Sequence, residues 1–271
     1  MELTCVVDNT AGRALTWAEH GLCVWIKDRG AQIMWDSGES PALLQHNLRA
    51  LDLDLQALNA AALSHGHVDH SGGLPWVLEQ RAGLTVHAHS DILVPRYSER
   101  KGQLEAIGVP EALRADGMNW ALSSEPVALS AHVRTTGGIA ERPYPEGGSD
   151  HLFCRRDGQV VLDDYGDDLS LVLTVPGGIV LLCGCCHAGL RNTLATLRRQ
   201  SDEPLLAVIG GTHLGAATRA EIDAIADRLQ QEGSPRLYLN HCTGATAQHI
   251  LWGTFGERLE SFSTGMRIVF D

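Results

Sequence analysis

The chain has 271 residues, of which 44% are hydrophobic, and its 33 acidic and 21 basic residues give a formal net charge of −12 at pH 7. This composition is typical of a globular protein with a full core, and its negative field disfavours nucleic acid and anionic membranes as partners. The segment MELTCVVDNT has no signal-peptide pattern, no apolar run nears the roughly 20 residues that span a bilayer, and the seven cysteines lack disulfide-framework spacings, so we expect a cytoplasmic protein.

The first part of the chain predicts a strand meander followed by alternating helices and strands. Three segments rich in β-branched and aromatic residues indicate the meander, at 3–9, 21–27 and 31–36. Residues 41–53 carry leucines at helical spacing, residues 71–80 indicate a second helix, and residues 84–90 another strand. Residues 95–150 combine charged segments with scattered glycine and proline, so we expect long loops there.

From residue 151 the same order repeats. Strand patterns occur at 151–156, 159–164, 169–175, 178–184, 204–211, 236–242 and 266–270. Helix patterns occur at 189–200, 216–233 and 245–253. Two halves of this kind predict two sheets packed face to face with helices outside, an α/β four-layer αββα sandwich formed as a single domain by residues 1–271.

The run LSHGHVDHSGGL, residues 63–74, predicts a metal site. Residues two apart in an extended segment point to the same side, so His65 and His67 are placed to bind one ion. The helix that starts at SGGL turns Asp69 and His70 toward a second position. Two ions roughly 3.5–4 Å apart generate hydroxide near neutral pH and polarise an ester or amide.

Two histidines do not complete a metal site, so we expect further ligands at later strand ends. LLCGCCHAGL presents Cys185 and His187, VIGGTHLG presents His213, and LYLNHCTG presents His241. Each follows an apolar strand and precedes a turn of small residues, where α/β folds gather active-site groups. Cys186 and Cys242 are interpreted as small buried residues.

Six segments together resemble the metallo-β-lactamase superfamily, whose signature is a His-X-His-X-Asp-His loop after a strand. The likeness covers nearly the whole chain, and its narrower match is the group of 7,8-dihydropterin-6-methyl-4-(β-D-ribofuranosyl)aminobenzene-5′-phosphate synthase-like proteins. The segments are VVDN at 6–9, WDSG at 35–38, SHGHVDHSGGL at 64–74, GCCHAGLRNT at 184–193, GGTHL at 210–214 and HCTG at 241–244.

The resemblance implies a binuclear centre in the αββα sandwich. It implies His65 and His67 as ligands of the first ion, and Asp69, His70 and His241 as ligands of the second. Asp69 is also the residue that orients or deprotonates the attacking water in the superfamily.

Two further residues are assigned around that centre. Asp36 in WDSG is expected to support the ligand loop from behind. His213 is the candidate that binds substrate or donates a proton.

The sequence departs from the hydrolytic members of the superfamily in two places. They carry a Gly-His-Thr-type histidine where this chain reads YGDDLS, and a bridging aspartate where it has Cys185. The third ligand of the first ion therefore stays open among His187, Cys185 and Asp168, with His187 ranked first. A thiolate favours Zn²⁺ and an aspartate would admit Mn²⁺ or iron, so we take two divalent ions with zinc as the default.

The leading function hypothesis is a metal-dependent hydrolase or pterin-phosphate synthase-like enzyme acting on a small, phosphorylated or heterocyclic substrate. Arg100, Lys101 and Arg142 are candidate anion contacts. The alternatives are a metallo-hydrolase of a phosphodiester, lactone or thioester, and a non-enzymatic metal-binding or redox-responsive protein.

Overall fold

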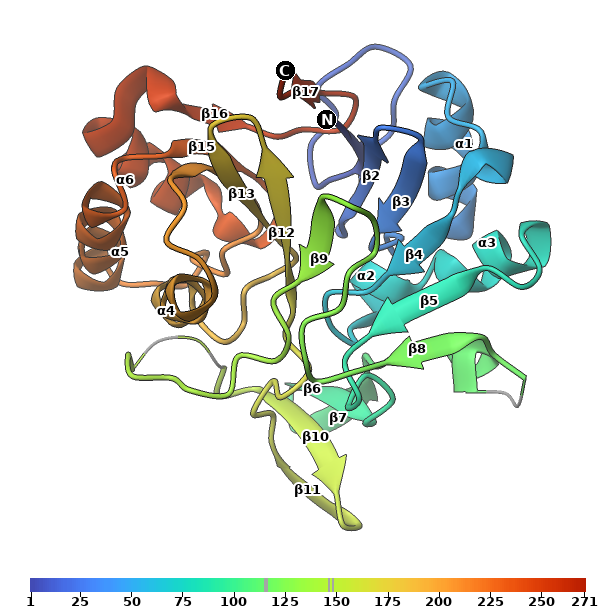
Figure 1. The fold of residues 1–271 in the computed structure, drawn as a ribbon. Helices are drawn as coiled ribbons and strands as arrows, with labels where there is room; N and C mark the ends of the chain where they lie inside the picture. The colour runs from blue at the N-terminus through green and yellow to red at the C-terminus, as the bar shows by residue number, and fades with distance from the viewer. Residues whose placement is uncertain (115–116, 146, 148) are drawn as a thin grey trace.

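The computed structural model describes residues 1–114, 117–145, 147 and 149–271 (Figure 1). One sheet gathers mostly N-terminal strands, and its first strand pairs at the edge with the last strand of the chain. In spatial order the strands are β17 (Arg267–Val269), β1 (Glu2–Val7), β2 (Cys23–Asp28), β3 (Ala31–Trp35), β4 (Ala60–Ala62), β5 (Thr85–Ala88) and β8 (Trp120–Leu122).

A second sheet comes from the C-terminal half. Its strands in spatial order are β16 (Leu259–Ser261), β15 (Arg236–Leu239), β14 (Leu205–Gly210), β13 (Gly178–Cys183), β12 (Ser170–Val175) and β9 (Val133–Thr135). β13 to β16 are parallel, so their carboxyl ends meet at one edge of the sheet. Both β13 and β14 are almost wholly buried, as expected of parallel strands covered on both faces.

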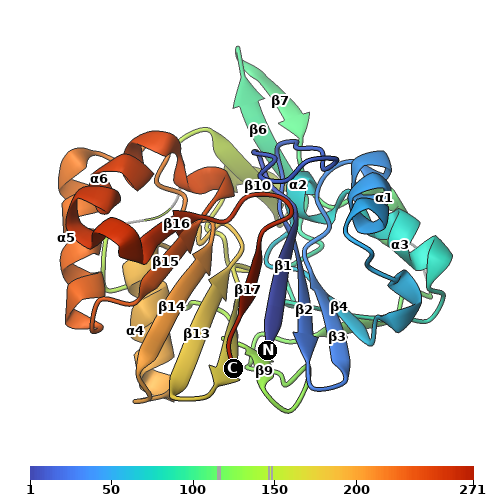
Figure 2. The same cartoon turned by 90° about the horizontal axis from the view of Figure 1, so that it is seen from above.

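The two sheets pack face to face, and helices cover their outer faces (Figure 2). On the first sheet lie α1 (Pro41–Ala50), α2 (Val68–Ser71) and α3 (Leu74–Gln80), with the short turns η1 (Leu55–Ala57) and η2 (Glu111–Arg114). On the second lie α4 (Leu190–Gln200), α5 (Arg219–Gln231) and α6 (Ala245–Phe255), with η3 (His241–Thr243) and η4 (Gly256–Arg258). Three hydrophobic clusters separate these layers, which confirms the predicted αββα sandwich.

Local sequence explains where α1 and α5 start. Ser40 caps α1 by accepting from the amide of Leu43, and Pro41 occupies the first helical turn, where its missing N–H costs nothing. Thr218 and Glu221 form a reciprocal capping box at the start of α5. No helix in the described part of the chain is both long and apolar enough to span a membrane.

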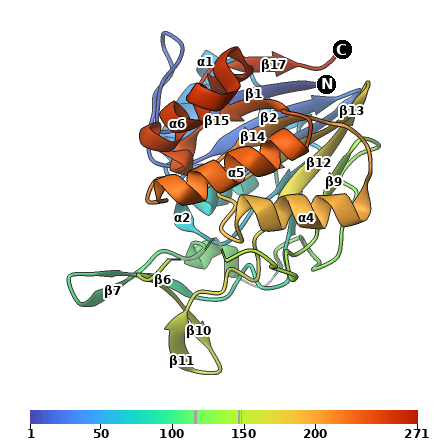
Figure 3. The same cartoon turned by 90° about the vertical axis from the view of Figure 1, so that its left-hand side faces the viewer.

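A third, small sheet corrects the expectation of long loops over residues 95–150. It consists of β11 (Gln159–Leu162), β10 (Leu152–Arg156), β6 (Arg96–Arg100) and β7 (Gln103–Ala106). This sheet projects from the sandwich in Figure 3. β10 and β11 lie at the strand patterns predicted for 151–156 and 159–164, whereas β6 and β7 fall in the region expected to be loops. β6 and β7 are rich in charged and polar residues, so they lack the apolar pattern that identifies strands in sequence. Residues 115, 116, 146 and 148 of that region lie outside the described residues.

Trp35 links the two sheets, which generates a first prediction. Its side chain is fully buried between them, and its Nε1 donates to the carbonyl of Cys183 at 3.3 Å. We expect Trp35→Ala to lower the free energy of unfolding by about 3–5 kcal/mol, because it leaves a cavity and an unpaired carbonyl. Urea unfolding checks this against Trp252→Ala, whose side chain is 55% exposed; equal losses in the two variants would contradict it.

Candidate metal centre

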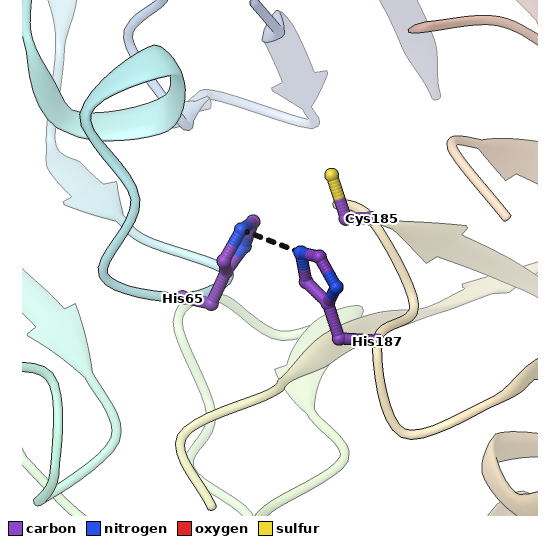
Figure 4. A group of neighbouring side chains, drawn as sticks. All are labelled: His65, Cys185 and His187. Carbon is purple, nitrogen blue, oxygen red and sulfur yellow. Dashed lines mark hydrogen bonds between the residues drawn. The ribbon is translucent and has the colours of Figure 1, made fainter. Parts of the chain in front are cut away.

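Histidine and cysteine side chains from both sheets converge where β4, β13 and β15 end. Two groups of three have their ligand atoms within 4.8 Å of one another: His65, Cys185 and His187, and His70, Cys185 and His241. Figure 4 shows the first group, with the rings of His65 and His187 facing each other from two loops. Cys185 belongs to both groups, so its sulfur lies between them.

A buried ion cluster supports the loop that carries His65 and His67. Gly66 lies between His65 and His67, and its amide donates to Asp167 Oδ2 at 2.7 Å. Arg96 contacts Asp167 at 2.7 Å and Asp163 at 3.0 Å, with all three side chains fully buried. A Cβ at Gly66 would lie 2.6 Å from the Arg96 guanidinium, so only glycine allows this approach.

Asp36 fixes the orientation of two histidines. Its carboxylate accepts from the amide of Ser64 at 2.7 Å, from Ser64 Oγ at 2.8 Å and from His70 Nδ1 at 2.8 Å. Because the Ser64 hydroxyl proton goes to Asp36, Ser64 Oγ accepts from His65 Nδ1 at 2.9 Å. Both histidines therefore carry their Nδ1 proton and aim Nε2 into the centre, as second-sphere carboxylates commonly arrange at metal sites. This confirms that Asp36 supports the ligand loop.

His241 is oriented in the same way from the opposite loop. Its backbone amide donates to Asp8 at 2.8 Å, and its Nδ1 donates to Asn9 Oδ1 at 2.9 Å. The amide of Gly21 also donates to Asn9 Oδ1, which identifies that atom as the oxygen. His241 Nε2 then faces His70 Nε2 at 3.1 Å. Two lone pairs at this distance repel each other unless a cation, either a proton or a metal ion, lies between them.

The pKa values of the buried histidines differ between the two sides of the centre. Burial lowers the pKa of His67 to about 3, and it lowers those of His65 and His187 well below their usual value. Burial also disfavours charge on His70, but the carboxylates of Asp69 and Asp36 outweigh it and raise its pKa to about 9. Without metal, the histidines of the first group are neutral, whereas His70 in the second group is doubly protonated and positively charged.

Asp69 lies beside the second group. Its Oδ2 is 3.4 Å from His241 Nε2, 3.5 Å from His70 Nε2 and 3.2 Å from His20 Nε2. Burial would raise the pKa of Asp69, but these three imidazoles hold it well below its usual value, so Asp69 is ionised. His20, Asp69 and His241 form a further candidate ligand group.

A third candidate ligand group contains a second cysteine, Cys242. Cys185, His213 and Cys242 have their ligand atoms within 4.8 Å of one another. The His213 ring lies 4.2 Å from the His187 ring between centroids, and its buried Nδ1 has no hydrogen-bond partner. Cys242 was interpreted as a small buried residue, whereas it is only partly buried and lines the pocket over the centre.

Asp168 lies apart from these groups. Its Oδ2 accepts from the amide of Ala188 at 2.7 Å, and it is in none of the ligand groups among the described residues. Burial raises the pKa of Asp168 to about 7. His187 and Cys185 therefore share a candidate ligand group with His65, whereas Asp168 does not. His67 is in none of these groups either, but its Nδ1 lies 2.9 Å from His65 Nε2.

The pocket over the centre has a volume of about 400 Å³, and the two central cysteines and the candidate histidines His67, His187, His213 and His241 line it. Arg100 reaches its rim but pairs with Glu105 at 3.4 Å. Arg142 does not line this pocket: its guanidinium donates to the carbonyls of Ile139, Asp164 and Tyr165. Its role is therefore to hold a loop.

Several residues of the site have no recognisable signal in the sequence. His20 and Arg96 are single residues far in sequence from the groups that they contact. Asn9 in VVDN and Asp167 in YGDDLS lie in segments quoted above, but no role was assigned to either residue. The acidic stretch that contains Asp163, Asp167 and Asp168 is the sequence signal that could have indicated a buried ion cluster.

The buried ion cluster generates the second prediction. Arg96→Met leaves Asp163 and Asp167 buried without their counter-charge, so we expect the free energy of unfolding to fall by about 3–5 kcal/mol. Arg219→Met, which removes an exposed ion pair with Asp223, should cost less than about 1 kcal/mol. Chemical denaturation of both variants measures the difference in unfolding free energy. If Arg96→Met lowers it as little as Arg219→Met does, the buried ion cluster does not stabilise the loop that carries His65 and His67.

Comparisons with known proteins identify relatives over most of the chain. A curated relative from Methanocaldococcus jannaschii, named 7,8-dihydropterin-6-methyl-4-(beta-D-ribofuranosyl)-aminobenzene-5′-phosphate synthase, is 26% identical over 94% of this chain and 91% of its own. An uncharacterised protein of the same archaeon is 28% identical over 89% of this chain and 90% of its own.

Among solved structures, Tm1679, titled a metal-dependent hydrolase of the beta-lactamase superfamily, superposes with a TM-score of 0.86 at 24% identity over 100% of both chains. At that identity the superposition supports the fold alone. The sequence model of the metallo-beta-lactamase superfamily matches residues 16–199, more than half of the chain. This protein therefore belongs to the metallo-β-lactamase superfamily.

Proposed function

We propose that the protein is a metal-dependent enzyme whose centre takes two divalent ions. His65, His67 and His187 would hold the first ion, and Asp69, His70 and His241 would hold the second, with Cys185 available to either. The observation that carries this proposal is the pair of Nε2 atoms of His70 and His241, which face each other at 3.1 Å while acceptors occupy both Nδ1 atoms.

The donor set fits zinc better than harder metals. Imidazole nitrogens and a thiolate are soft to borderline ligands, whereas manganese prefers carboxylate and carbonyl oxygens. Asp69 is the only carboxylate in the proposed set. A divalent ion bound there supplies Lewis acidity and lowers the pKa of a water molecule near it.

The chain's own residues supply the remaining chemistry. Asp69 is ionised and lines the pocket, so it orients or accepts a proton from the attacking group. His213 also lines the pocket, and it is the residue that would bind the substrate or donate a proton to it. His20 at the rim positions Asp69 through its 3.2 Å contact.

The pocket fits a small substrate. Arg100, which pairs with Glu105 in the same pocket, and His151 are the cationic or polar groups that would contact an anionic or phosphorylated part of it. The relative named as a synthase supports a pterin phosphate as substrate. Hydrolysis of a phosphodiester, lactone or thioester by a metal-bound hydroxide is the alternative carried over from the sequence analysis. Both use the same centre, so a panel of these four substrate classes separates them.

Metal content tests the proposal directly. Elemental analysis of the purified protein should find about two equivalents of divalent metal. His67→Ala and Cys185→Ser should each lower that content and abolish turnover in the substrate panel, because each removes a ligand. His249→Ala, which removes an exposed histidine from α6, is the matched control. Metal content unchanged in both ligand variants would overturn the centre.

The raised pKa of His70 predicts how metal binding depends on pH. Below about pH 9 the ion must displace the His70 proton, so the affinity of the second site should rise with pH, by up to about tenfold per unit. Asp36→Asn removes one of the carboxylates that raise this pKa. Calorimetry in buffers of different ionisation heat should find fewer protons released at pH 7 by this variant than by the wild type. Equal release would contradict the assignment.

A further inference from the structure

Two thiols lie together at the centre although 57 positions separate them in the sequence. The Sγ atoms of Cys185 and Cys242 are within 4.8 Å of each other, and Cys242 Sγ is 3.6 Å from the carbonyl oxygen of Cys185. Cys185 follows β13 and Cys242 follows β15, which are separated in the sheet by β14.

The end of β14 makes this meeting possible because it has no side chain there. A Cβ at Gly211 would lie 2.6 Å from Cys242 Sγ and 2.5 Å from the carbonyl oxygen of Gly184. No real Cβ comes that close, so the position that a side chain would occupy is taken by the sulfur of Cys242. The absence of a side chain at Gly211 thus allows the sulfur of Cys242 to lie close to Cys185.

The pair is also reachable from solvent. Cys185 and Cys242 both line the pocket, and no other cysteine of the described residues does so. Cys242 is partly exposed, whereas the other six cysteines are buried. The backbone amide of His213 donates to Cys242 Sγ at 3.3 Å, which stabilises charge on that sulfur.

We propose that Cys185 and Cys242 form a reversible disulfide when a peroxide enters the pocket of the metal-free protein. Cys242 attacks one peroxide oxygen and becomes a sulfenic acid, releasing the first water. The Cys185 sulfur then displaces the sulfenic oxygen as the second water, so two thiols and one hydrogen peroxide give one disulfide and two waters. A dithiol reverses the bond by exchange.

This bond would couple the oxidation state of the pair to metal binding. Cys185 is the sulfur common to both proposed ligand groups, and it no longer has a thiolate to offer once it is oxidised. Bound metal in turn occupies Cys185 and protects the pair. This second part rests on the proposed function, whereas the disulfide itself depends only on the two thiols.

The test is peroxide treatment of the full-length protein, once stripped of metal with a chelator and once loaded with zinc. Peptide mapping without reductant should find Cys185 linked to Cys242 in the stripped protein, with the loss of two hydrogen atoms. Dithiothreitol should restore both thiols and zinc binding. Cys154→Ser should keep the linkage and Cys242→Ser should lose it.

The two parts fail in different ways. Oxidation of Cys242 to a sulfinic acid, or links among other cysteines without the Cys185–Cys242 peptide, would overturn the disulfide. The mapping of the wild-type protein decides this even if a variant does not fold. Equal linkage with and without zinc would keep the disulfide but overturn Cys185 as a metal ligand.

Discussion

The buried carboxylate of Asp36 is the contact on which the centre depends. It binds the amide and hydroxyl of Ser64 and the ring of His70, and through Ser64 it also sets the proton on His65. A carboxylate with no exposed surface is stable only when hydrogen bonds satisfy it, and here these bonds come from the ligand loop. The same contacts that stabilise Asp36 leave two Nε2 lone pairs facing inward. The hydrogen bonds that stabilise the buried Asp36 carboxylate therefore also orient the Nε2 atoms of His65 and His70 toward a cation.

The sandwich brings the remaining donors to that point. β4 of the first sheet delivers the histidine loop, and the parallel strands β13 and β15 of the second sheet end in Cys185 and His241. Because parallel strands end at one edge, residues that are far apart in sequence meet there. The absent side chain at Gly211 lets the strand ends on either side approach each other, so the fold concentrates sulfur as well as imidazole around one pocket.

Patterns within short segments predicted much of this. The spacing from His65 to His70 and the position of Cys185, His187, His213 and His241 after apolar strands are local properties, and buried strands and amphipathic helices have local periodicity. β6 and β7 of the small sheet have no such periodicity because they are rich in charged and polar residues; β6 pairs with β10, and β7 pairs with β6. His20 and Arg96 were missed because their contacts join residues far apart in the chain, and no local spacing marks them.

The central claim is that two ions share one cysteine sulfur between two sets of histidines. Anomalous scattering at the zinc absorption edge, from crystals of the zinc-loaded protein, locates each ion directly. The account predicts two peaks, one against the ring nitrogens of His65, His67 and His187 and one against those of His70 and His241. Both should lie at about 2.3 Å from Cys185 Sγ. A single peak, or peaks that do not contact Cys185, would contradict it.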